Sequence, residues 1–254
     1  MEVHMSQNDS VVIAYSLTPG ELLQYRSTVA TKQVIVENDE APQVIESFLE
    51  IMMDQKITEV SNGVAKVEVT ITDGSVRRGT DVLPLESVGQ KLTMNMKRNG
   101  DIESTSVNFP FSQPAFPSQP LKPSDSWQTV NPISIPLNQN GAVKQVNLVY
   151  RHTFSRLDRK NGYDVAVIDI SCPSVEMDLQ EDVKQTITAE GCTYFAHTQG
   201  RLVGSSVHTH TEVKAPGAQV STDITVGVEL VNALIANGDA DALPVSDEQF
   251  IIGT

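Results

Sequence analysis

The sequence predicts a mainly β fold built from two tandem antiparallel meander units of about 100 residues each, with at most one short helix. Three observations lead to this prediction: apolar and polar residues alternate in short stretches, Asn-Gly pairs separate such stretches, and a set of landmarks recurs along the chain. Alternation with a period of two puts one face of a strand on a core and the other in water. Asn-Gly pairs supply the positive φ angles that tight hairpins need. The sequence leaves open whether the two units pack face to face as a sandwich or join as one curved half-barrel.

The recurring landmarks predict that one structural unit is present twice. Each landmark of the first half reappears in the same order in the second half, at offsets of 99 to 104 residues. The pairs are Asn62-Gly63 with Asn161-Gly162, residues 100–107 with 200–207, Gly89 with Gly191, and residues 19–21 with 123–125. Short-repeat solenoids have periods of only about 20–50 residues, so this spacing indicates two copies of a larger unit.

Four strands are expected in the same order in both units. Those of the first unit are predicted near residues 47–60, 64–72, 90–98 and 101–109, and those of the second near residues 145–157, 163–172, 192–198 and 201–213. Further strands are predicted near residues 20–36 and 219–231. The stretch 165–172 is apolar on both faces, which predicts a place near the centre of the fold. The one helix candidate is residues 228–236, where a short apolar stripe competes with period-two alternation continuing from the preceding strand.

The predicted boundaries divide the chain into four segments. Residues 1–17 form an N-terminal segment, residues 18–121 the first β-repeat, residues 122–235 the second β-repeat, and residues 236–254 a C-terminal tail or closing strand. Seven of the 13 prolines lie between Pro110 and Pro136. Because proline lacks a backbone N–H donor and stiffens the chain, this stretch is predicted to be an ordered crossover or spacer, not a strand of the sheet. A terminal strand would complete the chain's own sheet or add to the open edge of a neighbouring subunit.

The composition excludes several functions. With 32 acidic and 18 basic residues among 254, the formal net charge is -14 and the sequence pI is about 4.7. Such a charge repels phosphate backbones and anionic headgroups, so no nucleic-acid partner is expected. No apolar stretch approaches the roughly 20 residues of a membrane-spanning helix, so no membrane span is expected. A chain of this length buries enough apolar surface to fold without a metal or a disulfide, so no cofactor is expected.

His208 and His210 are the best candidates for chemistry. Residues two apart on a strand face the same side, so the two imidazoles could bind one metal ion, with His152 or His197 as a third ligand. The surrounding serines, threonines and Glu212 favour a solvated polar strand instead. The sequence contains no nucleophile elbow, no phosphate-binding glycine loop and no calcium-binding loop. The sequence therefore predicts a protein that is not an enzyme, with a metal-dependent hydrolase using His208 and His210 as an alternative.

The two cysteines fall in neighbouring predicted strands. Aligning the two units places both Cys172 and Cys192 on inward faces. If they are opposed, a disulfide would close a loop of about 20 residues and stabilise the fold by about 3 kcal/mol in an oxidising compartment. The alternative is two buried free thiols.

Methionines cluster in the first unit. Met52, Met94 and Met96, together with Met53, fall on neighbouring predicted strands. Methionine suits irregular apolar cavities, so these side chains could line a groove for a lipid or another apolar ligand. Ordinary core packing is the alternative.

The boundary between the two units resembles a known sequence pattern. Residues 121–127 read Leu-Lys-Pro-Ser-Asp-Ser-Trp. This run is similar to an uncharacterised family of bacterial envelope-associated proteins, in which a proline-rich turn leads to Gly-Asp-Ser-Trp at the start of a β-rich repeat. Ser124 stands where such proteins commonly have Gly, and the chain has no lipobox cysteine. The resemblance implies an antiparallel domain in an extracytoplasmic place, such as the periplasm, the cell surface or the secreted fraction, and it implies no particular chemistry.

Together these patterns support three interpretations of function. The first is a non-enzymatic envelope or extracellular β-protein that acts in binding or assembly through the surface and edges of its sheet. The second is a carrier of a lipid or other apolar ligand in a methionine-lined cavity between the sheets. The third is the metal-dependent hydrolase described above.

Overall fold

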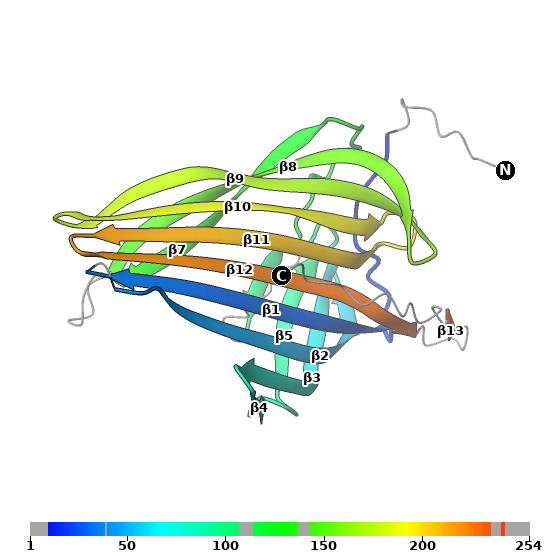
Figure 1. Ribbon diagram of the computed structural model, residues 1–254. Helices are drawn as coiled ribbons and strands as arrows, with labels where there is room; N and C mark the ends of the chain where they lie inside the picture. The colour runs from blue at the N-terminus through cyan, green and yellow to red at the C-terminus, as the bar shows by residue number, and fades with distance from the viewer. Residues whose placement is uncertain (1–9, 39, 107–113, 137–142, 235–239, 242–254) are drawn as a thin grey trace.

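Strands make up the regular structure of the described part of the chain. The computed structural model describes residues 10–38, 40–106, 114–136, 143–234 and 240–241. Within these ranges there is no helix, hence none that could cross a bilayer, and 13 strands form one antiparallel sheet (Figure 1). The strands are β1 (Leu22–Glu37), β2 (Gln43–Ser61), β3 (Val64–Arg78), β4 (Asp81–Pro84), β5 (Lys91–Lys97), β6 (Ile102–Thr105), β7 (Ser126–Pro136), β8 (Val143–Lys160), β9 (Tyr163–Gln180), β10 (Val183–Ala196), β11 (Arg201–Ala215), β12 (Ala218–Leu234) and β13 (Ala240–Asp241).

The two meanders join edge to edge. The order in the sheet is β6-β5-β3-β2-β1-β12-β11-β10-β9-β8-β7, with β4 beside β3 and β13 beside β12. The first unit therefore supplies β1 to β6 and the second supplies β7 to β12, and they meet where β1 pairs with β12. The sheet stays open, with β6 and β7 at its two edges. This confirms the mainly β fold of two meanders and shows the joined, curved arrangement in place of a sandwich.

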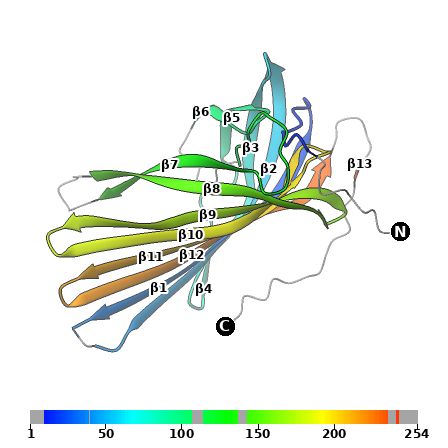
Figure 2. The same ribbon diagram turned by 90° about the horizontal axis from the view of Figure 1, so that it is seen from above.

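The curved sheet has two different ends. In Figure 1, β9 to β12 and β1 run side by side, while β3 and β5 cross behind them near one end. Figure 2 shows the same long strands fanning apart toward the other end. We call the first the closed end, which includes the turn at Asn161-Gly162. We call the second the open end, which includes the turns at residues 38–42, 181–182 and 216–217.

The main hydrophobic core lies at the closed end and draws on both meanders. Four consecutive residues of β9, Val165 to Ile168, are each no more than 1% exposed. Successive residues of a strand point to opposite faces, so both faces of β9 are covered there. This confirms the prediction that the stretch lies near the centre of the fold. Other members of the core include Leu23, Tyr25, Met53, Val67, Met94, Met96, Phe116, Phe154, Phe195 and Leu230.

The structure corrects two predictions about individual elements. The helix candidate is wrong, because residues 228–234 continue β12 and pair with β1. The proline-rich stretch was predicted to stay outside the sheet, but Pro132 and Pro136 lie in β7 and pair with β8. An edge strand tolerates proline because one side of it has no neighbour to receive an N–H donor. Residues 107–113, which include the end of one predicted strand, and the tail from residue 242 lie outside the described residues.

An N-terminal strap, residues 11–16, packs between the two meanders at the closed end. Tyr15 N donates to Arg98 O (2.6 Å) in the turn before β6, and Ser16 N donates to Gly200 O (2.7 Å) in the turn before β11. Both turns contain a glycine with positive φ, Gly100 (90°) and Gly200 (65°). A Cβ on Gly200 would lie 2.3 Å from Ser16 N, so only glycine leaves room for the strap. The strap therefore contacts two turns, at Gly100 and Gly200, that occupy equivalent positions among the landmarks recurring in the sequence.

The boundary turn before β7 is tightly hydrogen-bonded around a strained residue. Ser124 has a φ of 79°, a left-handed conformation that favours glycine. Its backbone N–H donates to Phe154 O (2.7 Å), and Phe154 N returns a hydrogen bond to Asp125 O (2.9 Å). The Asp125 carboxylate also accepts a hydrogen bond from Lys122 N (2.8 Å).

Replacing Ser124 with glycine should stabilise the protein by up to about 1 kcal/mol. A left-handed backbone costs a non-glycine residue about 1–2 kcal/mol, and the added freedom of glycine in the unfolded chain takes back about 0.5–1 kcal/mol. Urea unfolding followed by circular dichroism measures the difference. The control is Ser126→Gly in β7, which has no such strain and should lower stability; equal effects of the two changes would refute the explanation.

Candidate functional site

The two faces of the curved sheet differ in polarity. Residues that lie directly opposite each other on neighbouring strands share a face, so the register assigns each side chain to one face. We call the face that carries the core at the closed end the concave face, and the other the convex face. One row of opposed residues on the concave face, here called the apolar row, crosses from β7 to β3 without an acid, lysine or arginine. It consists of Trp127, His152, Ile170, Gly191, Val207, Val226, Val29, Leu49 and Val76.

Toward the open end the concave face becomes more polar but stays uncharged from β9 to β2, and charges appear only beyond these strands, at Arg78 of β3 and Lys144 of β8. The next two rows from β9 to β2, here called the hydroxyl rows, mix aliphatic residues with threonine, serine and glutamine. They consist of Cys172, Ala189, Thr209, Ile224, Thr31 and Ser47, and of Val175, Ile187, Thr211, Thr222, Gln33 and Ile45. Gln33 Nε2 donates to Thr222 Oγ1 (3.4 Å). A second apolar cluster, which includes Leu148, Met177 and Ile187, packs on the β7 to β10 side of these rows.

The convex face carries ion pairs on both sides of the apolar row, one toward the closed end and one beside the hydroxyl rows. Arg26 lies 3.9 Å from Glu229, and Lys32 lies 3.7 Å from Glu46, with all four groups partly or well exposed. The sheet is therefore amphipathic across its middle. At the closed end the concave face is buried in the main core, but the valines of the apolar row in β11, β12 and β1 are only half-buried. An uncharged, partly wetted aliphatic surface of this extent is typical of a binding surface.

The closed end of the concave face contains a buried ion pair. Arg201 Nη2 lies 3.1 Å from Glu21 Oε1, and the two side chains are only 5% and 3% exposed. Burial raises the pKa of Glu21, and the Arg201 charge partly opposes this rise. The hydroxyl of Tyr25 donates to Leu202 O (3.3 Å), and burial raises its pKa strongly. Arg201 Nε and Nη1 and the Tyr163 hydroxyl have no hydrogen-bond partner among the described residues.

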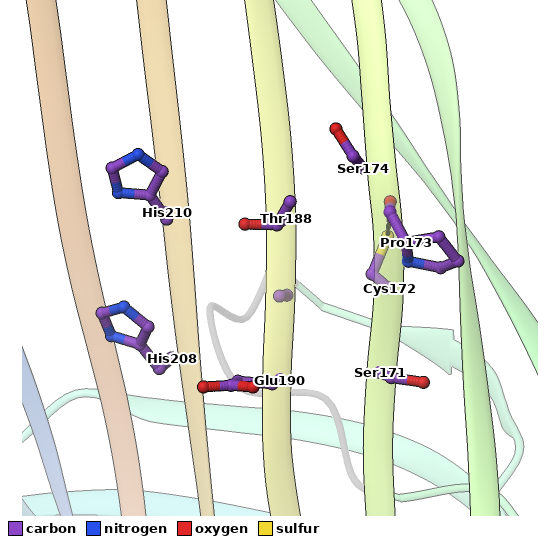
Figure 3. A pocket seen from close by; sticks show the side chains of 9 residues that line it. Ser171, Cys172, Pro173, Ser174, Thr188, Glu190, His208 and His210 are labelled. Carbon is purple, nitrogen blue, oxygen red and sulfur yellow. Dashed lines mark hydrogen bonds between the residues drawn. The ribbon is translucent and has the colours of Figure 1, made fainter.

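A shallow depression on the convex face holds the histidines singled out by the sequence. Pro173 and Ser174 together oppose the single residue Thr188, which makes a bulge in β9. The depression beside the bulge has a volume of about 490 Å³. Figure 3 shows His208, His210 and Glu190 on the same side of the sheet, with Cys172 directed away from them. The lining consists of Ser171, Cys172, Pro173, Ser174, Thr188, Ala189, Glu190, His208 and His210.

Asp223 links the two histidines. Its Oδ1 lies 2.8 Å from His210 Nδ1 and 3.4 Å from His208 Nε2, and His208 Nδ1 contacts Thr225 Oγ1 (3.2 Å). The imidazoles and the carboxylate are each about 40% exposed, so water competes for every one of these contacts.

The third metal ligand expected from the sequence does not join His208 and His210. His152 lies on the concave face, where its ring stacks on Trp127 with centroids 5.3 Å apart and burial lowers its pKa. His197 lies beyond the end of β10, and burial lowers its pKa too. Across the ranges that the structure describes, no group of three or more His, Cys, Asp and Glu side chains could hold a metal ion.

The two cysteines are free thiols on opposite faces. Cys172 pairs with Ala189, whereas Cys192 pairs with Asp169, three positions further along an unbroken register. An odd separation reverses the face, so Cys172 points to the concave side and Cys192 to the convex side with Tyr194. The expectation that both point inward is therefore wrong for Cys192, and no disulfide can join them without moving the backbone. Burial raises the pKa of both thiols.

The methionines occupy the core in place of a cavity. Met94 and Met96 are 7% and 1% exposed and pack at the closed end with Met53. Met52 pairs with Arg26 and so points to the convex face. The surface suited to an apolar ligand is instead lined by valine, isoleucine and leucine. The period-two alternation of β1 and β12 was visible in the sequence, but nothing in it marked which apolar face the described residues leave partly exposed.

Comparisons with known proteins identify a shared fold. No protein-family model matches the sequence, and no curated protein matches it significantly. The solved structure of lipovitellin, which is described in terms of lipid–protein interactions, aligns with this chain. The TM-score is 0.50 at 10% identity, over 91% of this chain. The alignment covers 27% of the lipovitellin chain, so this protein spans little more than a quarter of that length.

Two further solved structures align with lower scores. DynF from the dynemicin biosynthesis pathway of Micromonospora chersina has a TM-score of 0.24 at 8% identity, over 86% of this chain and 84% of its own. A LolA superfamily protein from Nitrosomonas europaea has a TM-score of 0.16 at 15% identity, over 81% of this chain and 86% of its own. Scores this low do not indicate a shared fold.

Proposed function

We propose that this protein is a non-enzymatic binder of a lipid or similar apolar ligand, which it holds on the concave face. The observation that carries the proposal is the apolar row. Its valines and leucine remain half-buried across β11, β12, β1 and β2, whereas the convex face carries ion pairs on either side of this row. Each Å² of apolar surface removed from water contributes about 25 cal/mol, so a ligand that covers this face gains affinity.

The shape of the sheet agrees with such a role. Lipovitellin, with which this chain shares its fold, is a protein whose structure was described by its lipid–protein interactions. The polar depression at His208 and His210 supports a hydrolase less well, because its histidines are open to water and no hydroxyl in it is hydrogen-bonded to them among the described residues. An envelope address, as the sequence resemblance implies, forms part of this proposal.

Assembly through the sheet edges is supported less than ligand binding. The β6 edge is only four residues long. The β7 edge is interrupted by Pro132 and Pro136, which cannot donate hydrogen bonds to an added strand.

A charge placed in the apolar row should weaken ligand binding. The purified protein is incubated with vesicles of equal parts dioleoyl phosphatidylcholine and dioleoyl phosphatidylglycerol, separated from them, and extracted for lipid analysis. Wild-type protein should carry lipid, whereas Val207→Asp should lose at least about tenfold in affinity, which corresponds to about 1.4 kcal/mol. The matched control is Ser206→Asp, one position away on the convex face, which should bind as wild type does.

Two further measurements keep the test decisive. Circular dichroism melting shows whether Val207→Asp folds, and Val226→Thr, which keeps the shape of the side chain, provides a milder change in the same row. Native mass spectrometry reports the oligomeric state. Homo-oligomers free of lipid, or equal lipid binding by Val207→Asp and Ser206→Asp, would contradict the proposal.

A further inference from the structure

The polarity of the concave face changes in one direction along the strands. At the closed end lie the main core and then the apolar row, followed by the hydroxyl rows and finally the turns of the open end. A ligand that is itself apolar at one end and polar at the other fits this gradient in one orientation only. This inference rests on the proposed function and adds the ligand class and its orientation.

We propose that the ligand is a long-chain amphiphile with a zwitterionic headgroup, held with its acyl chains toward the closed end. The headgroup then lies over the hydroxyl rows, and its ammonium group points to the rim of the open end. Three properties of the described residues support this: the length of the concave face, the lack of cations on its central strands, and the charge of two turns at its rim.

The length of the surface suits an extended chain. Ser27, buried at the edge of the main core, and Ile35, near the open end, lie on the concave face of β1, eight residues apart. At about 3.3 Å per residue, they are separated by about 26 Å. A compact apolar ligand would need an enclosed pocket, whereas an open curved face of this length matches an extended amphiphile, chain and headgroup together, lying along the strands.

The central strands of the headgroup region, β9 to β2, offer hydroxyl and amide groups but no lysine or arginine, whereas Arg78 of β3, opposite Ser47, and Lys144 of β8, opposite Ile135, lie on the same face toward its margins. Thr209, Thr211, Thr222, Thr31 and Gln33 can donate to and accept from ester and phosphate oxygens. Between β9 and β2 the two hydroxyl rows contain no lysine or arginine. An anionic headgroup over these central strands would therefore lie without an adjacent counter-charge, within the field of a chain with a net charge of -14.

Two of the turns at the rim of the open end are acidic. The turn after β1 presents Glu37 and Glu40, and the turn between β9 and β10 presents Glu181 and Asp182, all four exposed. The described residues of these two turns include no lysine or arginine. An ammonium group at the outer end of a zwitterionic headgroup is attracted to such a rim, whereas the uncompensated charge of an anionic lipid is repelled.

The proposal predicts selectivity between two lipids that share the same chains. Pure dioleoyl phosphatidylcholine and pure dioleoyl phosphatidylglycerol are titrated separately against the full chain at low ionic strength. The protein should bind the phosphatidylcholine about tenfold more tightly, and the preference should shrink as salt screens the rim. The double variant Glu181→Gln/Asp182→Asn should reduce the preference, whereas Glu190→Gln on the convex face should leave it unchanged.

The orientation of the bound lipid is measured by the fluorescence of Trp127, the sole tryptophan, which lies at one end of the apolar row. Phosphatidylcholine brominated near the chain terminus should quench its fluorescence more than the same lipid brominated close to the glycerol. Failure of both lipids to bind would refute the proposed function itself. Equal binding of the two, a preference for phosphatidylglycerol, or stronger quenching by glycerol-proximal bromine would overturn this inference while leaving apolar binding in place.

Discussion

Replacing Arg201 with methionine is expected to lower the free energy of unfolding by about 3–5 kcal/mol at pH 7. The guanidinium and the Glu21 carboxylate are both almost fully buried and lie 3.1 Å apart. Removing one partner of such a pair leaves the other charge buried without compensation. Urea unfolding of the two proteins, followed by the fluorescence of Trp127, measures the loss.

The loss should depend on pH in a known direction. Burial already raises the pKa of Glu21, and Arg201 opposes that rise, so removing Arg201 raises the pKa further. An acid whose pKa is higher in the folded state binds its proton more readily when folded, so the penalty is present at neutral pH and is relieved as pH falls through that folded pKa. The variant should therefore recover part of its stability between pH 7 and the ordinary pKa of Glu, 4.5.

The double variant Glu21→Leu/Arg201→Met is the matched control. It removes both buried charges, and such replacements are often neutral or stabilising by about 1–4 kcal/mol. We therefore expect it to be more stable than either single variant, which gives a large coupling energy in the cycle. Additive effects of the two single changes would show that the side chains do not form a buried pair.

Replacing Gly200 with alanine is expected to destabilise the protein by about 2–5 kcal/mol. The residue has a φ of 65°, which costs a non-glycine residue about 1–2 kcal/mol. The added Cβ would also lie 2.3 Å from Ser16 N and 2.8 Å from Ala14 O, both backbone atoms of the strap. Relieving such an overlap costs about 1–3 kcal/mol more. Thermal and urea unfolding measure the total.

Gly162→Ala separates the two contributions. Gly162 has a similar φ of 80°, but nothing lies within 4 Å of an added Cβ there. This variant should show only the conformational cost, and the excess in Gly200→Ala reports the packing of the strap. If both variants lose the same stability, the strap does not pack against this turn as the structure shows.

Local patterns in the sequence were sufficient for much of the fold. Alternation in residues 64–72 and 163–172 located β3 and β9, and Asn62-Gly63 and Asn161-Gly162 located the turns that follow β2 and β8. Elements whose position depends on tertiary context were missed. Strand β7 contains prolines that only an edge tolerates, and β10 begins in a polar stretch without a clear apolar face. A common ancestry of the two meanders remains a prediction from the recurring landmarks.

The candidate site could be predicted only in part, because face and register are global properties. His208 and His210 do share a face, as their spacing requires, but whether His152 or His197 joins them depends on pairings two or more strands away. The prediction that both cysteines point inward was wrong for the same reason, because a shift of one position in the register reverses the face of Cys192. The apolar row could not be predicted from the sequence, because its members come from strands far apart along the chain.

Because β1 pairs with β12, the sheet cannot be completed until the second meander has been synthesised. The Ser27 hydroxyl donates to Gly227 O across 200 residues of sequence, and the whole length of β1 pairs with a strand synthesised much later than itself. Contacts this distant slow folding, because loop closure must precede them. While the ribosome is still adding the second meander, one edge of β1 has no partner, so a nascent chain at this stage is the species that most needs protection from aggregation.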